Sequence, residues 1–328
     1  MELLDNHVRE QMTLATTGFE RHSKVTRREK VLGEMDRIVP WKRLRQIVKP
    51  YYFKGDGVGR RPIELERVLR IYFLQQCFNL SGPGVEDALY DMLSMRAFAR
   101  IDLGQAGVPG ETTVCEFRHL LEKHELGKKL FAEVNRHLAD CGIVVSGGTI
   151  VDATIIKAPS STKNKEKARD PEMHPTKKGN HWYFGMKAHI SADSRHRIVH
   201  TIVATAANVH DSAVLPQLLH GKETRVYGDS AYVGKTEAIR EKSPRARAFI
   251  NKRAYRSRPL TDRDKETNSR KSSTRSRVEH IFGTVKGLFG FRKVRYRGLA
   301  KNDNCLNVLF ALSNLFMVRK KLLRLSTA

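Results

Sequence analysis

The spacing of apolar residues changes at Gly142, and this change limits the chain to a helical half followed by a half with a β-sheet. In residues 63–80 apolar side chains recur every three or four positions, which is typical of an amphipathic helix. After Gly142 the chain instead has short segments rich in valine, isoleucine, threonine and tyrosine. We therefore predict an all-α N-terminal domain over residues 1–143 and an α/β domain over residues 144–328.

Two interpretations of the helical half stay open. Its later segments, residues 81–93 and 111–142, continue the helical pattern, with Ser81 as a suitable N-cap and Gly142 as a suitable end. Helices this close together could include a helix-turn-helix that binds DNA ends. They could equally form a compact bundle that makes no contact with DNA.

The α/β half is expected to contain three successive strands and then strands that alternate with helices. The strand segments are residues 142–159, 183–193, 196–206 and 224–232. A last helix over residues 304–323 should pack one apolar side against the sheet. Polar insertions at 157–180 and 252–274 interrupt this core, and their composition predicts that they are mobile until an anionic partner binds.

The positive charge is confined to the second half of the chain. Lys and Arg number 60 against 35 Asp and Glu, which gives a formal charge of +25 at pH 7. Residues 1–150 hold 23 basic and 20 acidic residues, whereas residues 151–328 hold 37 and 15. Within residues 242–297, 18 basic residues accompany only 4 acidic ones. Such an excess indicates a polyanionic partner and favours nucleic acid, because each neutralised phosphate releases counterions.

The cysteines and the apolar stretches predict a protein of the cytoplasm. The four cysteines form no C-x-x-C pair, which argues against a zinc knuckle and against a disulfide framework. The first ten residues are polar and acidic, unlike a secretory signal. The longest apolar stretch, residues 306–318, is too short for a membrane span of about 20 residues. We expect no contact with a membrane.

Three carboxylates stand at positions that suit a catalytic site. Asp152 lies inside an apolar strand, where an unpaired charge is costly to bury. Asp229 ends a later strand, at the edge where open α/β sheets usually place their chemistry. Glu279 lies in a helix among arginines. Hard divalent cations prefer such oxygen ligands, and two of them about 4 Å apart can clamp the attacking and leaving oxygens of phosphoryl transfer.

Each of these acids also has an ordinary structural interpretation. A strand aspartate can pair with an arginine, a Gly-Asp sequence can form a turn, and a helical glutamate beside arginine can be a surface ion pair. In a regular helix Arg275, Glu279 and Lys286 share one face. That row could hold metal and contact phosphates, or it could be a stripe of salt bridges.

Four motifs in this order are similar to those of a known protein family. They are VDAT around Asp152, TAANVHDS at 205–212, GDSAY at 228–232, and RSRVEHIFGTVKGLFGFRKVRYRGLAKN at 275–302. Together they resemble the DDE transposases of bacterial insertion sequences, in particular the insertion-sequence-five group. The resemblance extends to the helical N-terminal half.

The resemblance implies a ribonuclease-H-like catalytic domain, a mixed sheet flanked by helices, after the helical domain. It implies that Asp152, Asp229 and Glu279 are the catalytic and metal-binding residues, with two magnesium ions, for which manganese can substitute. The family's Tyr, Arg, Glu and Lys signature is matched except at the Tyr position, which is Ser272 here.

Candidate DNA-binding residues are Arg275, Lys286, Lys187, Arg253, Arg292, Arg295 and Arg297, and Lys157 is a further candidate for a phosphate contact. Tyr296, between Arg295 and Arg297, could stack on a base or anchor this segment in the core. Asp211, in the motif TAANVHDS, is a possible fourth acid, but its position also suits a helix cap, which is the interpretation we favour.

As the resemblance implies, the protein binds the terminal inverted repeats of its element in double-stranded DNA, cleaves the ends and joins the 3′-hydroxyl groups to target DNA. A homodimer on DNA is expected, because two ends must be paired, and the protein would act in the bacterial cytoplasm at the nucleoid. Two alternatives stay open. One is a ribonuclease-H-like nuclease without strand joining, and the other is an inactive, decayed DNA-binding copy.

Overall fold

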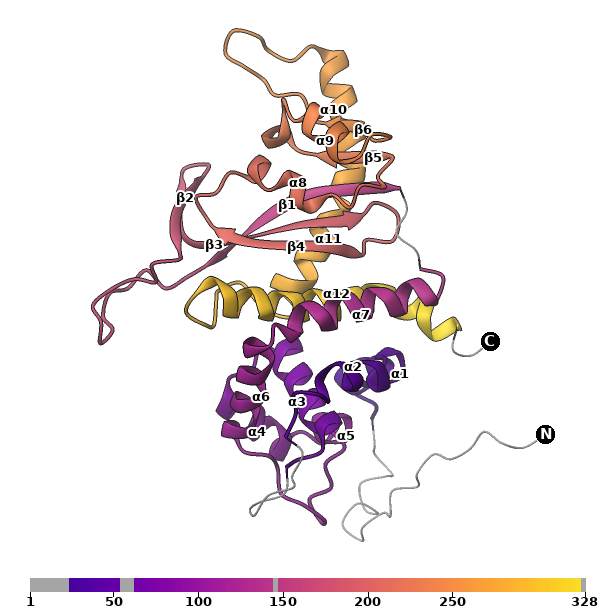
Figure 1. The fold of residues 1–328 in the computed structure, drawn as a ribbon, viewed down its shortest axis with the longest axis vertical. Coiled ribbons are helices and arrows are strands. Elements are labelled where there is room, and N and C mark those ends of the chain that lie inside the picture. Colours follow the sequence, from indigo (N-terminus) through magenta and orange to yellow (C-terminus); the bar gives the residue numbers. More distant parts are fainter. Residues whose placement is uncertain (1–23, 54–61, 144–146, 326–328) are drawn as a thin grey trace, which may run out of the picture.

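The structure is a computed structural model that describes residues 24–53, 62–143 and 147–325. The described part of the first half is helical, and the second half contains a six-stranded mixed sheet with helices. Figure 1 shows the helices of the first half at one end of the molecule and the sheet beyond them, with helix α12 in between. Among the described residues, no helix is both long and apolar enough to cross a membrane.

The helices of the first half begin and end where local sequence signals place them. Ser81 caps α4 by accepting a hydrogen bond from the Gly84 N–H at 3.0 Å, and Gly142, with φ of 69°, follows the end of α7. Both predicted helix signals are confirmed. The helices of this half are α1 (Arg27–Ile38), α2 (Trp41–Val48), α3 (Leu65–Cys77), α4 (Gly82–Asp91), α5 (Leu93–Phe98), α6 (Glu111–Lys123) and α7 (Leu126–Asp140).

The sheet has the strand order of a ribonuclease-H-like domain, which confirms the predicted fold class. Its central strand β1 pairs antiparallel with β3 and parallel with β5, β3 pairs antiparallel with β4 and with β2, and β5 pairs parallel with β6. Short helices α8 (Leu215–Leu218) and α9 (Thr236–Lys242) follow β4 and β5. The strands are β1 (Gly148–Lys157), β2 (His174–Lys178), β3 (His181–Asp193), β4 (Val199–Ala206), β5 (Arg225–Gly228) and β6 (Arg247–Ile250).

Regular structure occurs inside both segments that were expected to be polar insertions. The first contains β2, a polar and largely exposed strand that the pattern of apolar residues does not reveal, because it is held by backbone pairing with β3. The second contains helix α10 (Asp262–Arg275). Thr261 and Asp264 form a capping box at its start, which supports a helix whose side chains are almost all polar. The sequence pattern also did not predict strand β6, which has only four residues.

Helix α12 (Leu299–Leu325) joins the two halves into one core. The prediction of a single apolar side was wrong, because the helix is buried on several sides, including the polar residues Asn307 and Asn314. It packs against α7 and α1 of the first half and against β4 of the sheet. One continuous apolar cluster therefore reaches from Leu32 through the sheet to Leu322. The division into two domains at residue 143 stays a prediction.

Candidate active site

Asp152 lies in the middle of β1 and is largely buried. Its Oδ1 accepts a hydrogen bond from the Ala153 N–H at 2.8 Å, and its Oδ2 accepts one from Arg275 Nη1 at 2.8 Å. The side chain is 17% exposed. Burial raises the pKa of Asp152 to about 6, and although the nearby Arg275 opposes this, the negative charges of Asp229 and Asp211 reinforce it.

Asp229 comes to Asp152 through the register of two parallel strands. Strand β5 pairs with β1 so that Tyr227 lies opposite Ile150, and two residues farther along the strands are Asp229 and Asp152. The Asp229 side chain accepts a hydrogen bond from the Ala231 N–H at 2.8 Å and so begins the 3₁₀ turn η3 (Ser230–Tyr232). The structure therefore brings two of the three predicted carboxylates together.

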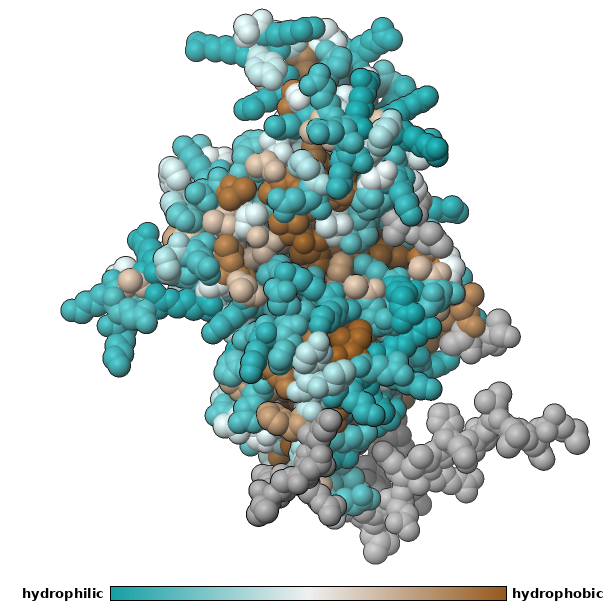
Figure 2. Space-filling model, in the orientation of Figure 1, coloured by the Kyte–Doolittle hydropathy of each residue, from teal (hydrophilic) through white to brown (hydrophobic). Residues whose placement is uncertain are grey.

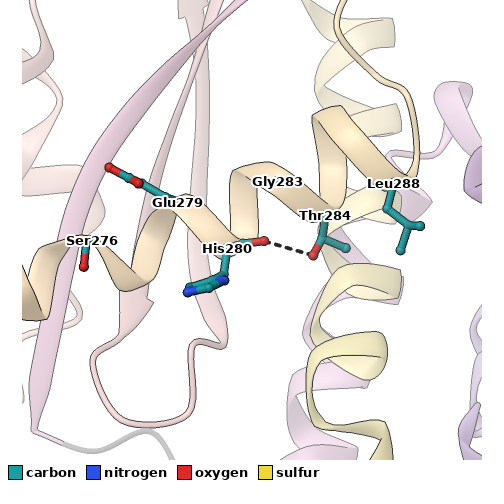
Figure 3. A pocket seen from close by; sticks show the side chains of 6 residues that line it. All are labelled: Ser276, Glu279, His280, Gly283, Thr284 and Leu288. Carbon is teal, nitrogen blue, oxygen red and sulfur yellow. Dashed lines mark hydrogen bonds between the residues drawn. The ribbon is translucent and has the colours of Figure 1, made fainter.

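Glu279 lies on α11 (Arg277–Phe282), which packs beside β1. Its side chain is exposed in a pocket of about 490 Å³ that is also lined by Ser276 and His280. Figure 3 shows the Glu279 and His280 side chains pointing in different directions, with a 3.0 Å hydrogen bond from the Thr284 hydroxyl to the His280 carbonyl. In the ranges that the structure describes, no three His, Cys, Asp or Glu side chains are grouped so that they could hold a metal ion.

The predicted row of Arg275, Glu279 and Lys286 runs through three helical segments rather than one regular helix. Arg275 ends α10, Glu279 is in α11, and Lys286 is in the π-helix η4 (Gly283–Leu288). Both cations nevertheless reach β1. Lys286 Nζ donates to Thr154 Oγ1 at 3.0 Å and to the Ile155 carbonyl at 2.9 Å. The first member of the row therefore contacts Asp152, and the last contacts the residues two and three positions after it on β1.

Lys286 belongs to a group of positive charges near the end of β1. Burial lowers its pKa, and the charges of Lys178, Lys157 and Arg292 lower it further. Arg292 Nε also donates to the Lys286 carbonyl at 2.9 Å. These cations form a positive group near the end of β1, beyond Asp152 on the same strand.

Asp211 is a further acid close to Asp152, whereas the helix cap was the interpretation that its sequence position favoured. The cap of the short turn at this point is His210, whose ring accepts a hydrogen bond from the Ser212 N–H. Asp211 instead accepts a hydrogen bond from Lys187 Nζ at 2.8 Å, and its charge raises the pKa of Asp152. The motif TAANVHDS was the signal that could have placed it in the site.

Tyr232 was also missed, although it lies in the motif GDSAY. Its side chain is only 1% exposed, and its hydroxyl has no hydrogen-bond partner among the described residues. Burial raises its pKa, and the charges of Asp211, Asp152 and Asp229 raise it further. The hydroxyl therefore lies close to the carboxylates, as a donor available to them or to a bound group.

The remaining basic candidates lie outside the carboxylate cluster. Arg295 is held by the connection between α3 and α4: it donates to Asn79 Oδ1 at 3.0 Å and to the Leu80 carbonyl at 3.1 Å. Arg297 pairs with Glu166, and the exposed Arg253 lies 6.0 Å from the centre of the Tyr255 ring. Contacts of these arginines with DNA stay predictions.

Two residues that the sequence left undecided have structural contacts. Ser272, at the tyrosine position of the family signature, accepts a hydrogen bond from Asn251 Nδ2 at 2.9 Å and so ties α10 to the end of β6. Tyr296 packs against the core, with the guanidinium of Arg118 4.3 Å from the centre of its ring. Of the two roles considered for Tyr296, anchoring of the basic segment is the one that its packing supports.

The chemistry of Asp152 and Asp229 fits a divalent cation. Both are oxygen donors of the kind that magnesium and manganese prefer. The raised pKa of Asp152 shows that burial and neighbouring negative charge disfavour its ionised form. A cation between the carboxylates would relieve that cost.

Comparison with known proteins shows the family of the chain. Residues 145–315 match the family model described as "Transposase DDE domain", and residues 19–120 match the one described as "Transposase domain (DUF772)". Among solved structures, a cryo-EM structure of the piggyBac transposase synaptic complex with hairpin DNA is similar, with a TM-score of 0.45 and 10% identity over 90% of this chain and 76% of that one. With the carboxylates and the first of these family matches on the same half, the protein belongs to the transposases with a DDE domain.

Proposed function

We propose that this transposase binds the terminal inverted repeats of its insertion sequence, cleaves the DNA at those ends and joins the 3′-hydroxyl groups to target DNA. The observation that carries the proposal is the meeting of Asp152 and Asp229 beside Arg275, with Lys286 held on the same strand by Thr154 and the Ile155 carbonyl. Negative and positive side chains converge there in a half of the chain with a large excess of positive charge. This combination suits a phosphodiester substrate.

Asp152, Asp229 and Glu279 would hold the metal ions, magnesium or manganese. When bound, two such ions supply electrophilic stabilisation of the phosphate and activation of the attacking oxygen. Glu279 is the exposed member of the set, on the helix beside β1. We propose that it joins the two aspartates when DNA is bound.

The protein side chains orient the site and the DNA. Arg275 holds one oxygen of Asp152 and leaves the carboxylate in a defined orientation. Lys286 and Arg292 lie where they would contact phosphates that flank the scissile bond. Lys187 fixes Asp211 by an ion pair of 2.8 Å. We propose that Arg253, Arg295 and Arg297 extend this positive surface along the DNA.

The partners follow from the reaction. Two element ends must be held together for joining, so we propose that a homodimer forms on DNA. The DNA substrate would place the protein in the bacterial cytoplasm, at the nucleoid. The nearly neutral helical half is then available for recognition of the ends or for pairing of subunits.

Incubation of the purified protein with a DNA end and magnesium tests the proposal. The DNA should carry the inverted repeat found beside the gene, and the products should be resolved on denaturing gels. Joined products support the transposase. Cleavage without joining would indicate a nuclease, and binding without cleavage by both the wild type and Asp152→Ala would indicate an inactive copy.

A further inference from the structure

A second pocket, of about 590 Å³, lies beyond the end of β1, away from the carboxylates, and its wall is both aromatic and basic. Lys157, Arg169, His181, Trp182 and Tyr183 contribute to that wall. The volume falls within the range of small-molecule sites, roughly 300–1,000 Å³. None of the roles proposed above uses this pocket.

Trp182 is exposed to a degree that is unusual for its size. Its side chain is 70% exposed, although an indole buries a large apolar area when it packs in a core. Trp182 lies opposite Lys177 in the pairing of β3 with β2, and Lys177 Nζ is 6.0 Å from the centre of the Trp182 ring. A flat aromatic face is therefore presented on a backbone fixed by strand pairing.

Cations surround the aromatic side chains of the pocket. Lys157 Nζ lies 5.3 Å from the centre of the Tyr183 ring, and the Arg169 guanidinium lies 5.4 Å from the centre of the Phe184 ring. Figure 1 shows this region projecting from one side of the molecule, and Figure 2 shows it as mostly hydrophilic. Aromatic faces with interleaved cations are typical of surfaces that bind single-stranded nucleic acid.

The acids of the same segment are turned away from the pocket. Glu166 pairs with Arg297, Asp170 accepts a hydrogen bond from the Gly298 N–H at 2.7 Å, and Glu172 accepts one from the Leu299 N–H at 2.6 Å. They are thus engaged at the start of α12. This separation leaves the cations of the pocket available to an anion.

One lysine of the pocket lies between the pocket and the candidate active site along β1. Lys157 lies near Lys286, whose pKa it lowers, and Lys286 contacts Thr154, two residues from Asp152 on β1. We propose that this pocket holds an unpaired nucleotide of the DNA substrate, with its base stacked on Trp182 and its phosphate beside Lys157 and Arg169. In a duplex both faces of a base are covered by its neighbours, so only an unstacked base can offer a face to the indole. This inference rests on the proposed function, because it takes DNA as the substrate.

Tryptophan fluorescence tests the pocket without metal and without cleavage. The chain has two tryptophans, and Trp41 is buried, so the exposed Trp182 should provide the emission that a nucleic acid can quench. Titration with single-stranded oligothymidylate should quench this emission. In a gel-shift assay, which does not need the indole, Trp182→Ala should weaken binding of the single strand by about tenfold and leave binding of a blunt duplex unchanged, whereas Trp182→Phe should retain most of the affinity. Tyr90→Ala, at an aromatic side chain that is 50% exposed in the helical half, is the matched control.

Two results would overturn the proposal that the pocket holds an unpaired nucleotide. One is unchanged single-strand binding by Trp182→Ala, and the other is an equal loss for duplex and single strand, which would make Trp182 a general DNA contact. The assay also separates this inference from the proposed function. If single-stranded DNA quenches the emission but the protein never cleaves DNA, the proposed transposase reaction is refuted and the nucleotide site is supported. If the protein cleaves DNA but the emission is not quenched, only the nucleotide site is refuted.

Discussion

Arg275 Nη1 donates a hydrogen bond to Asp152 Oδ2 at 2.8 Å, and this contact joins the last residue of α10 to the middle of β1. The two residues are 123 positions apart in the sequence. Because Arg275 opposes the effects of burial on Asp152, it keeps that carboxyl closer to its ionised form. The contact therefore fixes α10 against the strand that carries the candidate catalytic residue Asp152.

Arg275→Ala should therefore move the acidic limb of the cleavage pH profile upward by about one pH unit, because the pKa of Asp152 rises when the cation is removed. A carboxyl with a higher pKa becomes ionised only at higher pH, so activity lost at neutral pH should partly return under alkaline conditions. The measurement is the cleavage rate from pH 6 to pH 9. Arg270→Ala, at a 79% exposed position of α10, is the control. A uniform loss at all pH values would show that Arg275 does not act through Asp152.

Glu279→Gln should retain DNA binding and lose cleavage by about 10²-fold or more, because it removes a charged oxygen ligand at nearly constant shape. Binding is measured by gel shift and cleavage on labelled DNA ends. The matched control is Glu266→Gln, a change of an exposed glutamate on α10. Cleavage at the wild-type rate would remove Glu279 from the metal site.

Lys286→Ala should weaken binding of DNA at low salt and make the salt dependence shallower by about 0.9 in the slope of log affinity against log salt, the value for one phosphate contact. The measurement is the affinity over a series of salt concentrations. Lys320→Ala, at an exposed position of α12, should leave the slope unchanged. An unaltered slope for Lys286→Ala would show that this lysine serves only Thr154 and the backbone of β1.

Asn314→Leu should lower the free energy of unfolding by about 2 kcal/mol, because it leaves the buried Val199 N–H without its side-chain partner, whereas the Val199 carbonyl keeps Asn135 as a donor. Asn314 accepts a hydrogen bond from the Val199 N–H at 2.9 Å and donates to the Val199 carbonyl at 2.7 Å, which ties α12 to the start of β4. Urea titration measures the loss. Ser313→Ala is the matched control, since the neighbouring buried hydroxyl has no hydrogen-bond partner among the described residues and should cost little. Equal losses for both variants would contradict the role of Asn314.

His200 should make the protein less stable in acid. Burial, together with the charge of His220, lowers its pKa to about 4. Between pH 6.5 and pH 4 the unfolded chain binds a proton that the folded one excludes, so stability falls as the pH falls, by up to about 3 kcal/mol. His200→Gln should flatten the dependence of the free energy of unfolding on pH in this window. The exposed His181→Gln should not, and the same pH dependence in both variants would contradict the assignment.

Much of the fold was predictable because its signals are local. The change of pattern at Gly142, the cap at Ser81 and the apolar strands are properties of short segments, and they appear in the structure where the sequence predicts them. Strand β2 and helix α10 were not predicted. The first is held by pairing with β3, and the second has hardly any apolar side chains to reveal its period.

The residues of the candidate site could also be predicted only in part from the sequence. Asp152 and Asp229 were candidates because of their positions in and after apolar strands. Asp211 was considered as a further acid, but its position also suits a helix cap, and Tyr232 was missed because its motif also suits a turn. The ordinary interpretations hold as well, since Asp152 pairs with Arg275 and Asp229 begins a turn. One side chain can meet both demands, because a carboxylate has two oxygens and several lone pairs.

The sequence by itself determined the fold class, the family resemblance, the location of the positive charge and the choice of candidate acids, because these depend on composition and on patterns within short segments. Only the tertiary structure decided which side chains meet. The parallel register of β1 and β5 brings Asp229 to Asp152, and the path of α10 and α11 beside β1 brings Arg275 to Asp152. Such distances depend on the packing of elements far apart in the chain, and no local pattern encodes them.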